Sequence, residues 1–307
     1  MEPFAIAAIV AVLGLAIVDA QDDDDAAACV AVGQWLDPAT GKTVNHSAAI
    51  ARLAARDVVL LGESHTAVEH HRWQLHTIAA LHGRRDDIVL GFESFPRSVQ
   101  PALDAWVAGS LDEAAFLERT RWKDVWGVDA QFYLPLFHYA RLHRIPMIAL
   151  NVDRALVREV SKSGWAAVPD SDREGLDGPA APDPEYKTWL RSIYDAHHDG
   201  GGASQDGDAA FERFVEAQTV WDHAMASAIA DARKSEPRLV IGIAGRGHVV
   251  RGYGIPRQLR TLGVREVAVA LPVETARDCP EPGADGRPAA DLLFGVPEDP
   301  LEDAPSN

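Results

Sequence analysis

Residues 57–65 read DVVLLGESH, and this stretch decides the fold. Its apolar run is short and shows no polar alternation, which is typical of a strand buried on both faces. Similar runs occur at residues 88–92, 146–150, 239–244 and 266–271. Because helical segments lie between these runs, the chain is predicted to be an α/β protein with a mainly parallel sheet covered by helices on both faces.

Apolar spacing together with Gly and Pro stops predicts the helices. They are expected at residues 67–82, 99–108, 111–119, 133–143, 154–161, 184–197, 211–234 and 256–262. Residues 164–185 hold four prolines and predict a loop. A helical insertion is therefore expected at about residues 164–210.

The composition limits the classes of partner. The chain has 307 residues, 47% of them hydrophobic, which is enough for one large domain. It carries 46 acidic against 29 basic residues, a formal net charge of -17. Because such a surface repels phosphate backbones, nucleic acid is not expected as a partner.

The amino-terminal residues predict export. Residues 4–18 carry no charge and are fewer than the roughly 20 that a membrane-spanning helix needs. Residues 1–20 are predicted to be a signal peptide, cleaved before Gln21, or an N-terminal anchor, although the first residues lack Lys and Arg. The expected location is the periplasm or the membrane-associated cell envelope. Cys29 and Cys279 permit one disulfide, and two separate thiols are the alternative.

Three further parts follow from this pattern. Residues 21–45 are predicted to be an N-terminal extension, and residues 46–275 the α/β domain. Residues 276–307 are rich in Pro, Asp and Gly and are predicted to be a disordered tail.

Polar side chains follow the predicted strands where each strand ends. Glu63 and His65 follow the first, Glu93 the second, Asn151 the third, and Arg246 with His248 the fourth. In open α/β sheets, sites form beyond the carboxyl ends of the strands. One shared site is therefore predicted there.

The spacing Gly-x-x-His occurs directly after two strands, at Gly62–His65 and Gly245–His248. Imidazole and carboxylate ligands suit a divalent metal such as Mn, Zn, Fe or Co. We predict His65, Glu93 and His248 as metal ligands, and Glu63 and Glu93 as catalytic carboxylates. The alternative is that each His only caps its turn by bonding a backbone carbonyl.

A second cluster lies just before the Gly-rich residues 199–208, at Tyr194, His197 and His198. Tyr and His are ligands of haem iron, and solvated surface residues are the alternative. The histidines of residues 67–82 cannot all face one way, so some are expected to reach the strand-end site and most to lie at the surface.

Several stretches together resemble the ChaN-like haem-binding uptake family, part of the wider Tiki, TraB and erythromycin-esterase-like superfamily. They are VVLLGESHTAVEHHRWQ (58–74), IVLGFESF (88–95), YLPLFHYARLHRIPMIALNVDR (133–154), FVEAQTVWDHAMASAI (214–229) and VIGIAGRGHVVRGYGIPRQL (240–259). The resemblance implies an α/β sandwich and an envelope haem binder acting in haem or iron uptake. Transport partners in the envelope are implied too.

The resemblance to ChaN-like proteins implies that a tyrosine of the helical insertion holds haem iron. It also implies that two copies of the protein pair around stacked haems. Tyr194 is the matching residue, with Tyr186 as the second choice and His197 or His198 assisting. The Tiki branch implies a metal-dependent hydrolase using His65, His248 and Glu93, with Glu63 as base. A haem or iron-binding protein is the main prediction and the hydrolase the alternative. A third option is that the strand-end residues only form a structural hydrogen-bond network.

Overall fold

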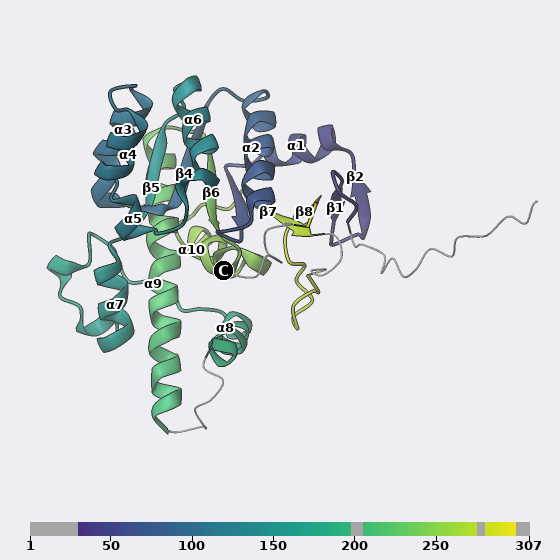
Figure 1. Cartoon of the computed structure of the whole chain (residues 1–307). Helices are drawn as coiled ribbons and strands as arrows, with labels where there is room; N and C mark the ends of the chain where they lie inside the picture. Colours follow the sequence, from purple (N-terminus) through teal and green to yellow (C-terminus); the bar gives the residue numbers. More distant parts are fainter. Residues whose placement is uncertain (1–29, 198–204, 275–279, 299–307) are drawn as a thin grey trace, which may run out of the picture.

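The computed structural model describes residues 30–197, 205–274 and 280–298, and its centre is one eight-stranded sheet (Figure 1). The strand order is β2-β1-β8-β7-β3-β6-β4-β5. The strands are β1 (Trp35–Asp37), β2 (Lys42–Val44), β3 (Val58–Glu63), β4 (Ile88–Pro96), β5 (Met147–Asn151), β6 (Leu239–Gly245), β7 (Val267–Glu274) and β8 (Leu292–Val296). All neighbours from β8 to β5 pair in parallel, and β1 pairs antiparallel with β2 and β8.

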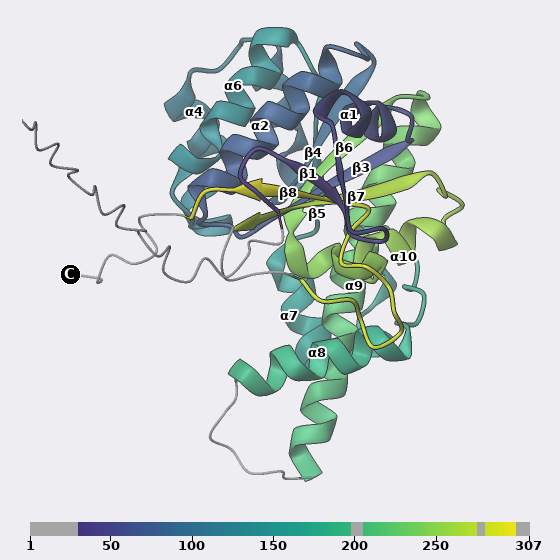
Figure 2. The same ribbon diagram turned by 90° about the vertical axis from the view of Figure 1, so that its right-hand side faces the viewer.

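Helices cover both faces of this sheet, which confirms the predicted fold class (Figures 1 and 2). They are α1 (His46–Ala54), α2 (Val68–His82), α3 (Gln100–Val107), α4 (Glu113–Arg119), α5 (Trp122–Val125), α6 (Leu134–His143), α7 (Arg154–Ser163), α8 (Pro184–His197), α9 (Gln205–Ser235) and α10 (Gly254–Thr261). The helices α1, α2, α3 and α6 pack on one face, and α9 and α10 on the other. Within the described ranges, no helix is long and apolar enough to cross a membrane.

The apolar run of β3 supplies side chains to two separate cores. Val59 and Leu61 belong to the core under α2 and α6, whereas Val58 and Leu60 belong to the core under α9 and α10. Successive side chains of a strand point to opposite faces, so a strand covered twice needs apolar residues at every position. This requirement explains why the deciding stretch lacks polar alternation.

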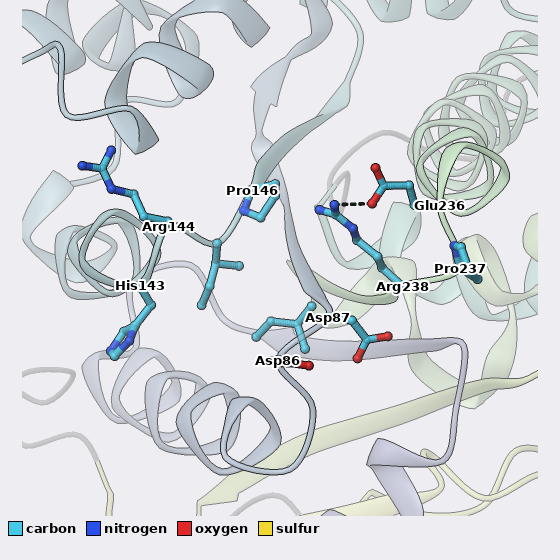
Figure 3. Close-up of a pocket in the computed structure, with 10 residues that line it drawn as sticks. Asp86, Asp87, His143, Arg144, Pro146, Glu236, Pro237 and Arg238 are labelled. Atoms are coloured by element: carbon cyan, nitrogen blue, oxygen red, sulfur yellow. Dashed lines mark ion pairs between the residues drawn. The ribbon is translucent and has the colours of Figure 1, made fainter.

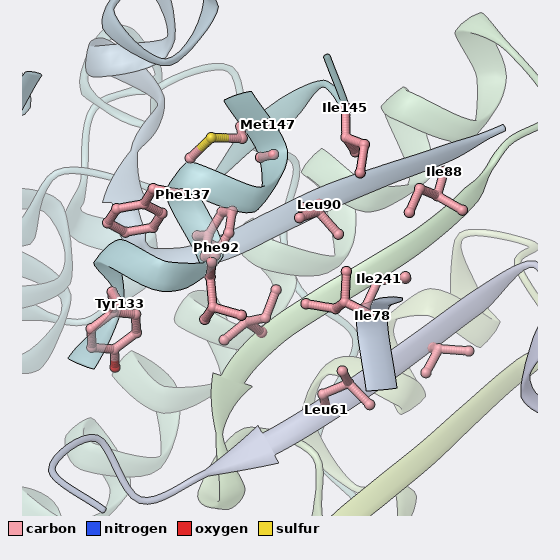
Figure 4. Close-up of a cluster of buried hydrophobic side chains, with 14 of the residues drawn as sticks. Leu61, Ile78, Ile88, Leu90, Phe92, Tyr133, Phe137, Ile145, Met147 and Ile241 are labelled. Carbon is pink, nitrogen blue, oxygen red and sulfur yellow. The ribbon is translucent and has the colours of Figure 1, made fainter. Parts of the chain in front are cut away.

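Aromatic rings fill the first of these cores (Figure 4). Phe92 of β4 lies 5.1 Å from Phe137 of α6, measured between ring centroids, and Tyr133 stacks on Phe137 at 6.2 Å. Phe92 and Phe137 are fully buried and Tyr133 is 1% exposed. This packing holds the start of α6 against the carboxyl ends of the central strands.

The structure corrects the predicted carboxyl-terminal tail. Residues 276–307 are predicted to be disordered, but Leu292–Val296 form β8, which pairs with β7 and β1. The apolar LLFGV run is short and lies among Pro, Asp and Gly, so its pairing partners decide its conformation. The strands β1 and β2 of the predicted N-terminal extension join the same sheet.

The helical insertion contains α8, and two short 3-10 helices, Trp165–Ala167 and Asp170–Asp172, interrupt the predicted loop. Figures 1 and 2 show α8 beside α9, beyond the end of the sheet. Cys29, Cys279, His198 and residues 1–20 lie outside the described residues.

Gly62 tests how tightly β3 is packed. A Cβ added there would overlap Cδ2 of Leu271 and lie 3.0 Å from Cγ2 of Val249. Gly62→Ala is therefore expected to lower the free energy of unfolding by about 1–3 kcal/mol, because both neighbours are buried and must shift. Urea denaturation measures the change.

Gly83→Ala, at the end of α2, is the matched control. Its added Cβ would lie 3.5 Å from the carbonyl oxygen of Ala79, an ordinary contact, and its φ is -64°. We expect a change within about 1 kcal/mol there. Equal destabilisation in both variants would contradict the packing argument.

Candidate functional site

The strand-end residues converge because three parallel strands are direct neighbours. β6 lies between β3 and β4, with Glu63 opposite Gly245 and Phe92 opposite Ile243. The pairing of β4 with β5 shifts register between Phe92 and Pro96. Such irregularities redirect side chains at the ends of strands, and Glu93 lies within this one.

Glu63 is the most enclosed carboxylate on the β3 side. It is 3% exposed and accepts hydrogen bonds from Gln74 of α2, at 2.9 Å, and from the hydroxyl of Tyr133. Its Oε1 lies 3.0 Å from Nδ1 of His65, and its Oε2 lies 3.4 Å from Nδ1 of His71. Both oxygens are therefore occupied within the protein.

These partners decide the charge of Glu63. Burial acts to raise the pKa of Glu63, but the hydrogen bond to His65, the charge of His71 and the bond from Tyr133 lower the pKa below its ordinary value. Burial and the neighbouring carboxylate raise the pKa of Tyr133. Glu63 is consequently a carboxylate and Tyr133 a neutral phenol at neutral pH.

His65 is the imidazole of this group that reaches solvent. Its side chain is 39% exposed, whereas the side chain of Glu63 is 1% exposed. Its ring packs edge-on against Trp126, with 4.6 Å between centroids. Burial acts to lower the pKa of His65, but the bond to Glu63 and the charge of Glu93 raise it.

Gly245 allows this ring to lie close to the neighbouring strand. A Cβ on Gly245 would lie 2.9 Å from Cε1 of His65 and 3.6 Å from Oε2 of Glu93. The backbone N–H of Gly245 donates to Oε2 of Glu93 at 2.6 Å. The glycine of the second Gly-x-x-His turn therefore brings the first histidine and the second glutamate together.

His248 completes the group from the 3-10 helix that follows β6. It is 7% exposed, its Nε2 lies 3.5 Å from Oε1 of Glu93, and its Nδ1 lies 2.7 Å from Oδ1 of Asp222 on α9. Burial acts to lower the pKa of His248, but the charge of Glu93 and the bond to Asp222 raise it to about 9. His248 is therefore an imidazolium at neutral pH.

The structure thus places Glu63, His65, Glu93 and His248 in one centre, which we call the strand-end centre. Their chemical roles stay predictions. Asn151 and Arg246 have structural partners instead: the amide of Asn151 donates to the carbonyl of Glu93, and Arg246 donates to the carbonyl of Pro272.

Four residues of this region carry no assigned role in the sequence reading. They are His71, Gln74, Tyr133 and Asp222. Some histidines of α2 were expected to reach the strand-end site, and His70 and His71 are 4% and 3% exposed, with His71 beside Glu63. The spacing of His71 and Gln74, three residues apart on one helix face, was the available signal.

The structure gives no support to the predicted divalent-metal site at His65, Glu93 and His248. Across residues 30–197, 205–274 and 280–298, no three His, Cys, Asp or Glu side chains are arranged to hold a metal ion. The Nδ1 atoms of His65 and His248 each face a carboxylate, and Oε2 of Glu93 accepts from the backbone.

Tyr194 of the insertion lies on α8 in a separate aromatic group, which we call the α8–α9 aromatic cluster. Its half-buried ring lies 5.6 Å from Phe211 and 5.4 Å from Phe214 of α9, between centroids. Trp189, also half-buried, lies earlier in α8 than Tyr194. His197 is the last residue of α8.

A groove of about 720 Å³ lies at the opposite edge of the sheet, where β4, β5 and β6 begin (Figure 3). Its charged lining includes Asp86, Asp87, His143, Arg144, Glu236 and Arg238. Glu236 and Arg238 form an ion pair with each other. This groove contains none of the predicted site residues.

Comparison with known proteins places the chain. The family model described as "Haem-binding uptake, Tiki superfamily, ChaN" matches residues 49–259, more than half of the sequence. The chain belongs to this family. None of the curated proteins matches this ChaN-family chain.

One solved structure, of a ChaN protein, supports the fold, and two others align less well. The structure described as "Cofacial heme binding to ChaN of Campylobacter jejuni" aligns with a TM-score of 0.68 and 20% identity. The alignment covers 85% of this chain and 95% of that one. The type III effector HopBA1 aligns with a TM-score of 0.47 and 14% identity, over 88% and 98%. A mutant of the erythromycin esterase EreC, in its open conformation, aligns with a TM-score of 0.46 and 14% identity, over 82% and 81%.

The raised pKa of His248 predicts how stability depends on pH. An unfolded histidine titrates near pH 6.5, so the stabilisation from His248 is complete below that pH and is lost as the pH rises through about 9. The expected loss is on the order of 3 kcal/mol in the free energy of unfolding, measured by urea denaturation at successive pH values.

His248→Gln is expected to remove most of this slope, because its amide does not titrate. His138→Gln, on an exposed face of α6, is the matched control and should keep the slope. A wild-type protein whose stability does not fall over this range would contradict the assigned electrostatics.

Proposed function

We propose that this chain is a haem- or iron-binding protein of the cell envelope that acts in haem or iron uptake. The observation that carries the proposal is its membership of the haem-binding ChaN family, over residues 49–259. The apolar, uncharged residues 4–18 support an envelope location. Tyr194 is the proposed iron ligand, with His197 assisting.

The α8–α9 aromatic cluster fits a porphyrin. Tyr194 and Phe214 are half-buried, so a flat apolar ligand can contact their rings. Haem, when bound, supplies an iron that a tyrosine phenolate can ligate. Packing against Phe211 and Phe214 holds the Tyr194 ring in place.

Arg191 is the cation best placed for the acidic groups of haem. Its side chain is 37% exposed, and its guanidinium lies 3.7 Å from the centroid of Phe211. It lies 2.9 Å from Asp208 and 3.9 Å from Asp195, exposed contacts that a carboxylate ligand can replace at little cost. Acidic propionates would therefore be held one turn from Tyr194.

A second copy of the chain is the proposed partner. A porphyrin held on one face by Tyr194 leaves its other apolar face in water, and covering that face is favourable. A homodimer around the ligand is thus expected to form with haem, and envelope transport proteins are the proposed donors or acceptors.

Titration with haemin tests the ligand assignment. Tyr194→Phe keeps the ring that packs on Phe211 and removes only the phenol oxygen, so we expect haemin affinity to fall by about tenfold or more, with a changed Soret band. Tyr139→Phe is the matched control, because Tyr139 bonds His82 on the opposite face of the sheet from α9. Absorbance titration gives both results.

A wild-type protein that produces no Soret shift would overturn the haem proposal itself. Equal haemin affinity in Tyr194→Phe and wild type would overturn only the assignment of Tyr194 as the iron ligand. The haemin affinity of Tyr186→Phe would then be measured. Sedimentation with and without haemin reports whether two copies pair around it.

Hydrolysis at the strand-end centre is the second candidate function, and one observation favours it. His65 is partly exposed, and the buried carboxylate of Glu63 fixes its Nδ1, which is how a general base is commonly held. His65, rather than the enclosed Glu63, is therefore the group that can take a proton from water. His248 and Glu93 lie beside it to stabilise developing charge or donate a proton.

Substitution of the proposed base tests this second function. Using a panel of ester and peptide substrates, His65→Asn and Glu63→Gln are expected to lower kcat about 10²- to 10⁴-fold. His76→Asn, at an exposed position of α2, is the control and should retain activity. Wild-type protein without activity on any substrate, or with activity unchanged in His65→Asn, would count against a hydrolase.

A further inference from the structure

A buried carboxylate on α9 lies behind the strand-end centre without a role in either proposed function so far. Asp222 is 0% exposed, in a helix whose neighbouring residues are mainly apolar. Burying a carboxylate is costly unless it is paired and hydrogen-bonded. Its partners therefore indicate what the residue is for.

Both oxygens of Asp222 are used. Oδ1 lies 2.7 Å from Nδ1 of His248, and Oδ2 accepts a 2.8 Å hydrogen bond from the hydroxyl of Tyr186. A Cβ on Gly254 would lie 2.6 Å from Oδ1, so only glycine at the start of α10 leaves room for the carboxylate. Three elements, α8, α9 and α10, thus build this position.

The arrangement repeats the one on the other side of the centre. In both halves a buried carboxylate oxygen faces Nδ1 of a histidine, at 3.0 Å for Glu63 and His65 and at 2.7 Å for Asp222 and His248. In both, an indole packs edge-on against the imidazole: Trp126 at 4.6 Å and Trp221 at 5.2 Å. The Nε2 of His248 is then left toward Glu93, at 3.5 Å.

We propose that Asp222 is a positioning residue of the strand-end centre. It holds the ring of His248 so that Nδ1–H of His248 points at the carboxylate of Asp222 and Nε2 points at Glu93. This inference rests on the second proposed function, in which the centre acts on a substrate. Asp222 itself does not contact the reacting atoms. Its effect passes through His248.

Through Tyr186, the placement of the Asp222 carboxylate depends on the helical insertion. Tyr186 lies on α8, two turns before Tyr194, and its ring stacks on Trp189 at 5.9 Å and 17°. The ring of Trp189 in turn lies 3.5 Å from where a Cβ of Gly247 would be, in the second Gly-x-x-His turn. Docking of α8 therefore supports both Asp222 and the turn that carries His248.

Proton NMR of ¹⁵N-histidine-labelled full-length protein tests the proposal without needing a substrate. In the wild type we expect a far-downfield, slowly exchanging imidazole Nδ1–H signal, which His248→Gln assigns by removing it. Asp222→Asn is expected to abolish or strongly shift this signal. Tyr186→Phe should keep the signal but raise its exchange rate about tenfold, because α8 then docks less firmly.

Thr219→Val is the matched control. Thr219 is a buried polar residue of the same helix, one turn before Asp222, and its hydroxyl donates to the carbonyl of Val215. Its substitution should leave the His248 signal unchanged. Circular dichroism establishes that each variant is folded.

An unchanged Nδ1–H signal in folded Asp222→Asn would overturn the positioning role. If Asp222→Asn does not fold, Tyr186→Phe decides, because it removes one of the two hydrogen bonds that hold the Asp222 carboxylate. An unchanged exchange rate there would also overturn the positioning role. These outcomes concern the geometry of His248, so they are separate from loss of hydrolysis in His65→Asn, which tests the function of the centre.

Discussion

Parallel pairing of β3 with β6, and of β6 with β4, is the constraint on which the rest of the structure depends. These strands are buried on both faces, so polar side chains are tolerated only where the strands end. Because parallel strands end at the same edge, Glu63, Glu93 and the Gly245–His248 turn meet there. The same register that builds the two cores therefore assembles the strand-end centre.

Several buried charges can share this small volume because each has a partner of opposite sign. Glu63 lies among His65, His71 and Tyr133, and Asp222 lies between His248 and Tyr186. Removing one member would leave a buried charge without compensation, which costs more than the pair gained by forming. Single substitutions in this network are therefore expected to destabilise the protein. This low tolerance fits a centre whose geometry matters for chemistry.

The insertion connects the two activities proposed for the chain. Helix α8 carries Tyr194 toward the aromatic rings of α9, and near its other end Tyr186 bonds the carboxylate behind His248. ChaN-family membership supports the first activity, and the carboxylate-imidazole pairs support the second.

The sequence by itself determined the fold class, most helices and strands, and the edge where Glu63, His65, Glu93 and His248 meet. Those features follow from local patterns, namely unbroken apolar runs, helical spacing and polar residues at strand ends. Tertiary structure alone decided the partners: β8 became a strand because β1 and β7 pair with it. Asp222 reached His248 across 26 positions of the chain, and Tyr186 reached Asp222 across 36. It also determined that His65, and not Glu63, reaches solvent, because burial depends on how distant helices pack and leaves no periodic signal in the chain.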